Sequence, residues 1–347
     1  MILLGFLACL AGLASADPIR IATYNTELGR KGPGLLLRAI LSGDDPQVEA
    51  VAAVIAHAHP DILLLQGIDY DLRGHTLTAL AEGLARHGID YPHRFARLPN
   101  AGLPIAGTDP PQFHSFGRFA GSGGMAILSR FPIEAEEARD FSDMRWRGQA
   151  WTVPPDMAHP DQRLSTMGHW DVPVRLPTGV LHLLAFHATP PVFDGPQDEN
   201  GLRNGDEVAF WQHYLDGDYG PAPERFVILG DFNNDPELGE GVKPPLSALL
   251  ADTRLRDPTP NAPTVDWSGL GLPPMRVSYI LPDKSTYVTG SGTVWPPPDD
   301  HLLQTVNSAS RHRLVWADIV LPPPTQENLS KPAKQRVRFL DPHRANR

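Results

Sequence analysis

The stretch that decides the fold is Phe226-Val227-Ile228-Leu229-Gly230-Asp231-Phe232-Asn233-Asn234-Asp235-Pro236. It begins as a short apolar run with β-branched residues, which predicts a buried β-strand. Because side chains alternate along a strand, we expect Asp231 and Asn233 to project from the same face at the strand's end. A carboxylate and an amide held side by side at the end of a buried strand suit a catalytic site. The alternative interpretation is a strand that ends in an Asx turn.

Three other predicted strands also end in polar residues. They are residues 19–25, ending on Asn25 with Glu27 nearby; residues 62–66, followed by Gly67, Asp69 and Asp71; and residues 180–187, ending on His187. Further strands are expected within 123–133, 275–281 and 312–321, and amphipathic helices over 46–58, 76–87 and near 207–215. No internal repeat or composition shift divides the chain, so we expect one domain over residues 17–321.

Composition restricts the class of protein. Residues 1–16 are apolar and uncharged, and Ala14-Ser15-Ala16 stands before Asp17. This pattern predicts a secretory signal peptide and a periplasmic or secreted protein, because the run is too short for a transmembrane anchor. Cys9 is the only cysteine, so a chain cleaved after residue 16 has no disulfide, catalytic thiol or thiolate-bound zinc.

The formal net charge of −10 argues against non-specific nucleic-acid binding, which needs Lys and Arg to neutralise phosphates. A metal-dependent enzyme remains compatible with this charge, because a bound ion supplies positive charge locally. The segment 322–347 is Pro-rich and then basic, and we interpret it as a C-terminal tail rather than a nucleic-acid arm.

A long polar segment, Thr189 to Asp206, follows the strand that ends on His187. Polar insertions of this length are usually functional or disordered. It is interpreted either as a solvated loop or as a flap that contacts substrate. Arg203 and Asn204 are its candidate substrate-binding residues.

The order of these pieces resembles the endonuclease/exonuclease/phosphatase superfamily, which includes DNase I-like nucleases, inositol phosphatases and sphingomyelinases. The resemblance covers roughly residues 19–320. The elements that carry it are the strand ending on Asn25, the strand ending on Gln66, residues 123–129 (Gly-Gly-Met-Ala-Ile-Leu-Ser), the strand ending on His187, residues 230–233 (Gly-Asp-Phe-Asn), residues 276–279 (Arg-Val-Ser-Tyr) and residues 310–312 (Ser-Arg-His).

The resemblance implies a four-layer α/β/β/α sandwich of two mixed sheets, and metal-assisted attack of water on a phosphoester. It implies that Asp231 activates or aligns the water and that Asn25 orients the site and the phosphate. Asn233 would steady the phosphoryl oxygens, and His187 and His312 would donate to the non-bridging oxygens. Hydrogen-bond donors together with one hard cation meet the needs of phosphoryl transfer.

Three acidic residues of the family pattern are absent. Gly67 stands where a metal-binding Glu is usual, Ser278 where an Asp orients the catalytic histidine, and Arg311 where the final motif has Asp. A hard divalent ion prefers carboxylate oxygens, so the metal site of the family cannot be assumed for this chain.

Two hypotheses account for these departures. In the first, which we favour, Asp69, Asp71 and Glu27 rebuild a site for a divalent cation, Mg²⁺ before Mn²⁺ or Ca²⁺, while Arg311 contacts the substrate phosphate. In the second, the site has decayed and only binds a phosphorylated ligand. A rebuilt site requires at least one of Asp69 and Asp71 to point into the cleft.

The sequence therefore predicts an exported, divalent-metal-dependent phosphoric ester hydrolase, acting on phosphodiesters and monomeric. Its partner is expected to be a phosphorylated small molecule or phosphodiester, with nucleic acid disfavoured by the net charge of −10. The alternatives are a phosphomonoesterase, a phospholipid head-group hydrolase, or a catalytically silent module that binds a phosphate ligand.

Overall fold

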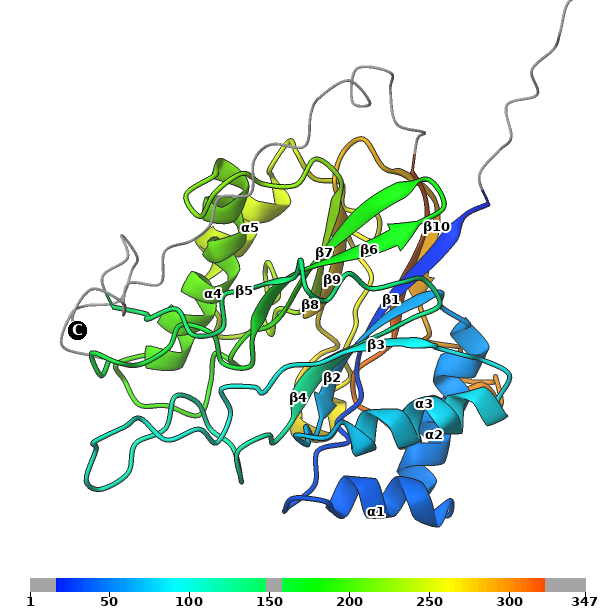
Figure 1. The fold of residues 1–347 in the computed structure, drawn as a ribbon, viewed down its shortest axis with the longest axis horizontal. Coiled ribbons are helices and arrows are strands. Elements are labelled where there is room, and N and C mark those ends of the chain that lie inside the picture. The colour runs from blue at the N-terminus through cyan, green and yellow to red at the C-terminus, as the bar shows by residue number, and fades with distance from the viewer. Residues whose placement is uncertain (1–16, 148–157, 322–347) are drawn as a thin grey trace, which may run out of the picture.

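Two β-sheets lie face to face in the computed structural model of the chain, which describes residues 17–147 and 158–321 (Figure 1). The first sheet has the order β10 (Tyr287–Thr293), β11 (Val315–Val320), β1 (Ile19–Asn25), β2 (Ile62–Ile68), β4 (Gly124–Ser129) and β3 (His93–Phe95). The second has the order β5 (Arg139–Asp140), β6 (His169–Leu176), β7 (Gly179–His187), β8 (Phe226–Asp231) and β9 (Ser278–Pro282). The pairs β1–β2 and β7–β8 are parallel and the others antiparallel, so both sheets are mixed.

The helices cover the outer faces of the sheets. Helices α1 (Leu35–Ser42), α2 (Pro46–Ala58), α3 (His75–Arg86) and α6 (Leu302–Ala309) pack on the first sheet, and α4 (Glu199–Asp216) and α5 (Lys243–Leu250) on the second (Figure 1). A short 3₁₀ turn, η1, spans Ser268–Leu270. The predicted four-layer α/β/β/α sandwich is confirmed. None of the helices within the described ranges has both the length and the apolar character needed to cross a membrane.

Strand β2 shows why the predicted strands are buried on both faces. Leu63 and Leu65 pack under the helices, and Leu64 packs between the sheets. Burial of such a side chain stabilises the fold by roughly 1.5–3 kcal/mol. An apolar run without alternation is the pattern expected of a strand covered on both sides.

Helix α2 begins and ends where its local sequence directs. The carboxylate of Asp45 accepts hydrogen bonds from the backbone N–H groups of Gln47 and Val48, each at 3.0 Å, and Pro46 occupies the first helical position. The helix ends at His59, which adopts a left-handed conformation with φ 50°. The predicted span of 46–58 is confirmed.

Helix α4 begins at Glu199 rather than near residue 207, so the expectation of a polar loop reaching Asp206 was wrong. Asn204 and Asp206 are buried in the helix instead of solvated, and Trp146 Nε1 donates to Asp206 Oδ2 at 2.6 Å. Tertiary hydrogen bonds thus outweigh the low helix propensity of this polar stretch. The loop after β7 is reduced to residues 188–198.

The signal peptide expected at residues 1–16 and the tail expected at 322–347 lie outside the described residues. The described chain between them forms the two packed sheets and their helical layers.

Candidate active site

The polar centre lies where the inward-facing rows of the strands end. Leu229 packs between the sheets, so Asp231, two residues later at the end of β8, faces the same way. Ala185 and His187 are related in the same way on β7, and His187 is the register partner of Asp231. The same alternation places Asn25 on the inner face at the end of β1. Three strand ends from two sheets therefore meet.

Asp231 is the hub of this centre. Asn25 Nδ2 donates to Asp231 Oδ2 at 2.7 Å. The same oxygen lies 3.8 Å from His187 Nε2 and 3.5 Å from His312 Nδ1. All four side chains are buried. The structure thus brings together four of the five residues to which the sequence assigned catalytic roles.

Several buried polar atoms at the centre have no hydrogen-bond partner among the described residues. They are His187 Nδ1, His312 Nδ1 and Ser278 Oγ, and Ser278 is the register partner of Asp231 across β8 and β9. Buried polar groups in proteins are almost always paired. These three atoms are thus left without a hydrogen bond inside the centre, although His312 Nδ1 faces Asp231 Oδ2 at 3.5 Å.

Burial lowers the pKa of His187 below its ordinary value, although the charge of Asp231 acts in the opposite direction. His187 is consequently a neutral imidazole at neutral pH and carries a single N–H donor. This N–H group can donate a hydrogen bond to a developing oxyanion.

Asn233 does not lie on the strand, contrary to the expectation that it and Asp231 share a face. Strand β8 ends at Asp231, and Asn233 has a left-handed backbone with φ 51°. Its backbone N–H turns back to Asp231 Oδ1 at 3.1 Å, as in an Asx turn, and its Nδ2 donates to Ala188 O at 2.8 Å. Asn233 is still beside the hub, but through the turn rather than through alternation.

Glu27 and Arg311 form an ion pair next to the hub. Arg311 donates to Glu27 through Nε, at 2.9 Å to Oε1, through Nη2, and through its backbone N–H at 2.8 Å. Ser310 Oγ donates to the backbone oxygen of Asn25 at 2.8 Å, which ties this segment to β1. Burial raises the pKa of Glu27, but the hydrogen bonds from Arg311 and the charge of His312 bring it below its ordinary value. The pair is therefore ionised at neutral pH.

Asp69 and Asp71 use their carboxylates for the backbone. Asp69 accepts from the backbone N–H groups of Arg30, at 2.9 Å, and Gly123, at 3.0 Å, one on each oxygen. Asp71 accepts from three backbone N–H groups around the start of α3. Both side chains thus have structural partners, Asp69 joining two loops and Asp71 holding a helix start.

Position 67 is closed to a side chain in this conformation. Gly67 has φ +70° and lies at a bulge in the β2–β4 ladder. A Cβ atom there would lie 2.7 Å from Asn25 Oδ1 and 2.9 Å from Glu27 N. Glycine is required both by the backbone angle and by the close approach of β1.

The donor set does not fit a divalent cation. Within 17–147 and 158–321, no group of three or more His, Cys, Asp or Glu side chains is arranged to hold a metal ion. Among the candidate ligands, Glu27 is paired with Arg311, and Asp69 and Asp71 are bonded to backbone N–H groups. A hard cation needs several free oxygen ligands around one point, and these three carboxylates do not supply them.

Arg203 and Asn204 lie on α4 with their side chains buried. Arg203 Nε donates to the backbone oxygen of Leu164 at 2.8 Å. Asn204 Nδ2 donates to the backbone oxygens of Thr189 and Phe232, each at 2.8 Å. Asn204 thus holds the segments that follow His187 and Asp231, whereas Arg203 holds the backbone of residues 163–165.

Glu207 is a positioning residue that was not predicted from the sequence. Its Oε2 accepts from Thr189 N at 2.6 Å and its Oε1 from Thr166 N at 2.5 Å. The available signal was its spacing, because Glu207 falls on the same helix face as the buried residues Phe210 and Trp211. An acid at a core position of an amphipathic helix needs a buried partner.

Glu207 makes a testable pH prediction. Burial raises its pKa from 4.5 to about 7, although the charge of Arg203 and the backbone N–H groups act in the opposite direction. Between these two values the folded state holds a proton that the unfolded state has released. This term therefore lowers the free energy of unfolding as pH rises, by up to about 1.4 kcal/mol per pH unit.

Urea unfolding of wild type and Glu207→Gln between pH 4.5 and 7.5 isolates this term, because glutamine does not titrate. The stability of the wild type should fall relative to the variant as pH rises through this range. A difference that stays constant across the range would show that Glu207 is ionised in both states.

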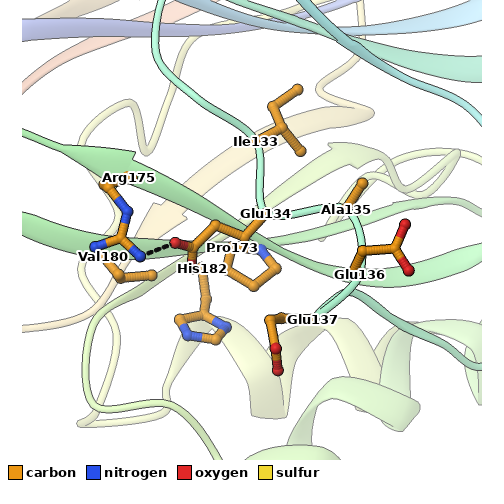
Figure 2. A pocket seen from close by; sticks show the side chains of 9 residues that line it. All are labelled: Ile133, Glu134, Ala135, Glu136, Glu137, Pro173, Arg175, Val180 and His182. Carbon is orange, nitrogen blue, oxygen red and sulfur yellow. Dashed lines mark hydrogen bonds and ion pairs between the residues drawn. The ribbon is translucent and has the colours of Figure 1, made fainter.

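A separate hollow of about 750 Å³ lies between residues 133–137 and the strands β6 and β7 (Figure 2). Its lining includes three glutamates together with Arg175 and His182. His182 Nδ1 contacts Asp171 Oδ1 at 2.6 Å. None of the residues gathered around Asp231 lines this hollow, so it is not part of the polar centre.

Comparison with known proteins supports a family assignment. The sequence profile of the Endonuclease/Exonuclease/phosphatase family matches residues 22–312. The endonuclease/exonuclease/phosphatase from Beutenbergia cavernae DSM 12333 has a TM-score of 0.56 and 21% identity, over 88% of this chain and 72% of that chain. A family protein from Leptotrichia buccalis C-1013-b has a TM-score of 0.54 and 16% identity, over 87% and 100%.

Sphingomyelinase C from Streptomyces griseocarneus has a TM-score of 0.50 and 18% identity, over 87% of this chain and 99% of that chain. No curated protein gives a match. At these identities the solved structures establish the shared fold, while the profile spans nearly the whole described chain. The chain therefore belongs to the endonuclease/exonuclease/phosphatase family.

Proposed function

We propose that this chain hydrolyses a phosphoester, and that its substrate is a phosphodiester. The observation that carries the proposal is the convergence of Asn25, His187 and His312 on the buried carboxylate of Asp231. The family contains phosphoesterases, and the sphingomyelinase C named above has the same fold.

Five residues have roles in the proposed reaction. Asp231 takes a proton from the attacking water as the water oxygen bonds to phosphorus and the bond to the leaving oxygen breaks. Asn25 holds the Asp231 carboxylate through its 2.7 Å hydrogen bond. His187 and His312 donate to the non-bridging oxygens, where negative charge develops, and Asn233 steadies the phosphoryl group.

The sequence favoured a divalent cation, Mg²⁺ before Mn²⁺ or Ca²⁺, but this cofactor is not part of the proposal, because Glu27, Asp69 and Asp71 are engaged elsewhere. The net charge of −10 favours a small phosphorylated substrate over a nucleic-acid polymer. Export and a monomeric state belong to the proposal on sequence grounds alone.

A phosphate-binding module without turnover is the second candidate function. It is favoured by the loss of the carboxylates usual at positions 67, 278 and 311, where the chain has Gly67, Ser278 and Arg311. Turnover distinguishes the two functions, because both predict phosphate binding at the same centre.

The test is hydrolysis of an aryl phosphodiester and of an aryl phosphomonoester by the full chain. Hydrolysis is measured as release of the aryl alcohol. We expect turnover of both to be measurable and kcat/KM to be higher for the diester. A higher kcat/KM for the monoester would show that the substrate is a phosphomonoester and not a phosphodiester. If neither ester is hydrolysed but phosphate still binds, the chain is a phosphate-binding module.

A further inference from the structure

We infer that Arg311, oriented by Glu27, supplies the positive charge that binds the phosphate group at this centre, so that phosphate binding there requires no divalent cation. The inference rests on the proposed function only in taking the ligand to be a phosphoester. It follows from how the guanidinium is held and from the engagement of the neighbouring carboxylates.

The guanidinium of Arg311 presents one of its edges to Glu27. Nε and Nη2 both donate to the Glu27 carboxylate, and the backbone N–H of Arg311 adds a further bond at 2.8 Å. Nη1 makes no hydrogen bond to any described residue, and 55% of the side chain is exposed. A guanidinium has two edges that each match an oxyanion. The edge formed by Nη1 and Nη2 is therefore open to a phosphate.

The ion pair is fixed directly to the polar centre. Glu27 N donates to Asn25 Oδ1 at 3.2 Å, and Asn25 in turn holds Asp231. On the other side, the backbone N–H of His312 donates to Ser310 Oγ at 3.1 Å. Arg311 is thus linked to Asp231 through Glu27 and Asn25, and its chain neighbour His312 contacts Asp231 directly. Its charge is therefore held in place without a ligand.

The neighbouring arginines cannot take this role because they are committed to internal partners. Arg276 is 5% exposed and donates to the carboxylate of Asp257. Arg313 is 1% exposed, and its Nη2 lies 3.6 Å from Asp266 Oδ2. Among these three arginines, Arg311 alone combines exposure with a free donor.

A metal ion would need the oxygens that the ion pair and the backbone already use. Glu27 is neutralised by Arg311, and Asp69 has a backbone N–H on each of its oxygens. Position 67 has no side chain and no room for a Cβ atom. A positive guanidinium next to Glu27 also repels a second cation.

Isothermal titration calorimetry with inorganic phosphate, in the presence of EDTA, tests this inference. Wild type should bind phosphate with the same Kd with and without EDTA. Arg311→Gln should weaken binding about 10- to 100-fold, because it loses charge-assisted hydrogen bonds. Arg311→Lys should fall between the two, because it keeps the charge but not the planar edge.

Arg130→Gln is the matched control. Arg130 is also an exposed arginine paired with a carboxylate, Asp61, at 2.7 Å, but it follows β4 at the other end of the first sheet. This variant should bind phosphate like wild type. Thermal unfolding of every variant shows that the chain is folded.

Two results would overturn the inference: phosphate binding that disappears in EDTA and returns with Mg²⁺, or unchanged affinity in Arg311→Gln. These outcomes are separable from the fate of the proposed function. If phosphate binding in EDTA depends on Arg311 but no ester is hydrolysed, the proposed hydrolase function is refuted and the inference about Arg311 stands. If hydrolysis requires a metal and is unchanged in Arg311→Gln, the inference is refuted and the hydrolase function stands.

Discussion

Asp231→Asn is expected to lower kcat/KM for an aryl phosphodiester about 1,000-fold, within the 10²–10⁴ range that a positioned general base contributes. The amide cannot accept the proton of the attacking water. Asn25 Nδ2 and Asn233 N both donate to the carboxylate. The variant should therefore also lose about 1–3 kcal/mol of stability, because one donor will face an amide nitrogen.

Asp171→Asn is the control for this loss of stability. Asp171 is another buried acid of the second sheet, bonded to His182 and Tyr214 on the helix-covered side of that sheet. Its substitution should cost a comparable amount of stability and leave kcat/KM unchanged. Comparable activity losses in the two variants would show that Asp231 acts through stability alone.

Gly230→Ala is expected to reduce the free energy of unfolding by about 3 kcal/mol or more. Gly230 has φ +152°, and a Cβ atom there would lie 1.9 Å from the backbone oxygen of Phe186, its partner across β7 and β8. Backbone cannot move aside as a flexible side chain does. The strands must separate next to His187 and Asp231, so activity should fall together with stability.

Gly220→Ala is the control for Gly230→Ala. It has the cost of a positive φ without the steric clash of the new Cβ atom. Gly220 also has a positive φ of +100°, but a Cβ atom there has open space around it. Alanine should cost only about 1 kcal/mol at this position. Urea unfolding measures both variants, and equal losses would argue that close approach plays no part at Gly230.

The strands that the sequence predicted well are those covered on both faces. Strands β1, β2, β7 and β8 lie within about two residues of their expected bounds, because their apolar runs cannot be placed anywhere but inside. Strand β6 was missed, since Pro173 and charged residues interrupt it. The neighbouring strand β5 pairs only with Trp170 and Asp171 of β6. Pro173 lies beyond this pairing, so its missing N–H group removes no hydrogen bond to β5.

The family resemblance implied that Asn25, His187 and Asp231 belong to one site, and these residues do lie together. It could not predict how the surrounding carboxylates are used. Asp69 bonds to Arg30 and Gly123, which are 39 and 54 residues away in sequence. No local pattern encodes such partners.

The length of α4 escaped prediction for a related reason. Residues 200–206 contain Asn, Gly and Asp, which favour loops in isolation. In the folded chain Asn204 bonds to the loops after β7 and β8, and Asp206 bonds to Trp146. Long-range hydrogen bonds decide the structure of this segment.

The central claim is that Asp231 and the histidines around it act on one phosphoester as a unit. Its most direct test is kcat/KM of Asp231→Asn, His312→Gln and the double variant on the same aryl phosphodiester. We predict that the double variant is about as slow as the slower single variant, because groups that act together are strongly non-additive. Losses that multiply in the double variant would contradict a shared site.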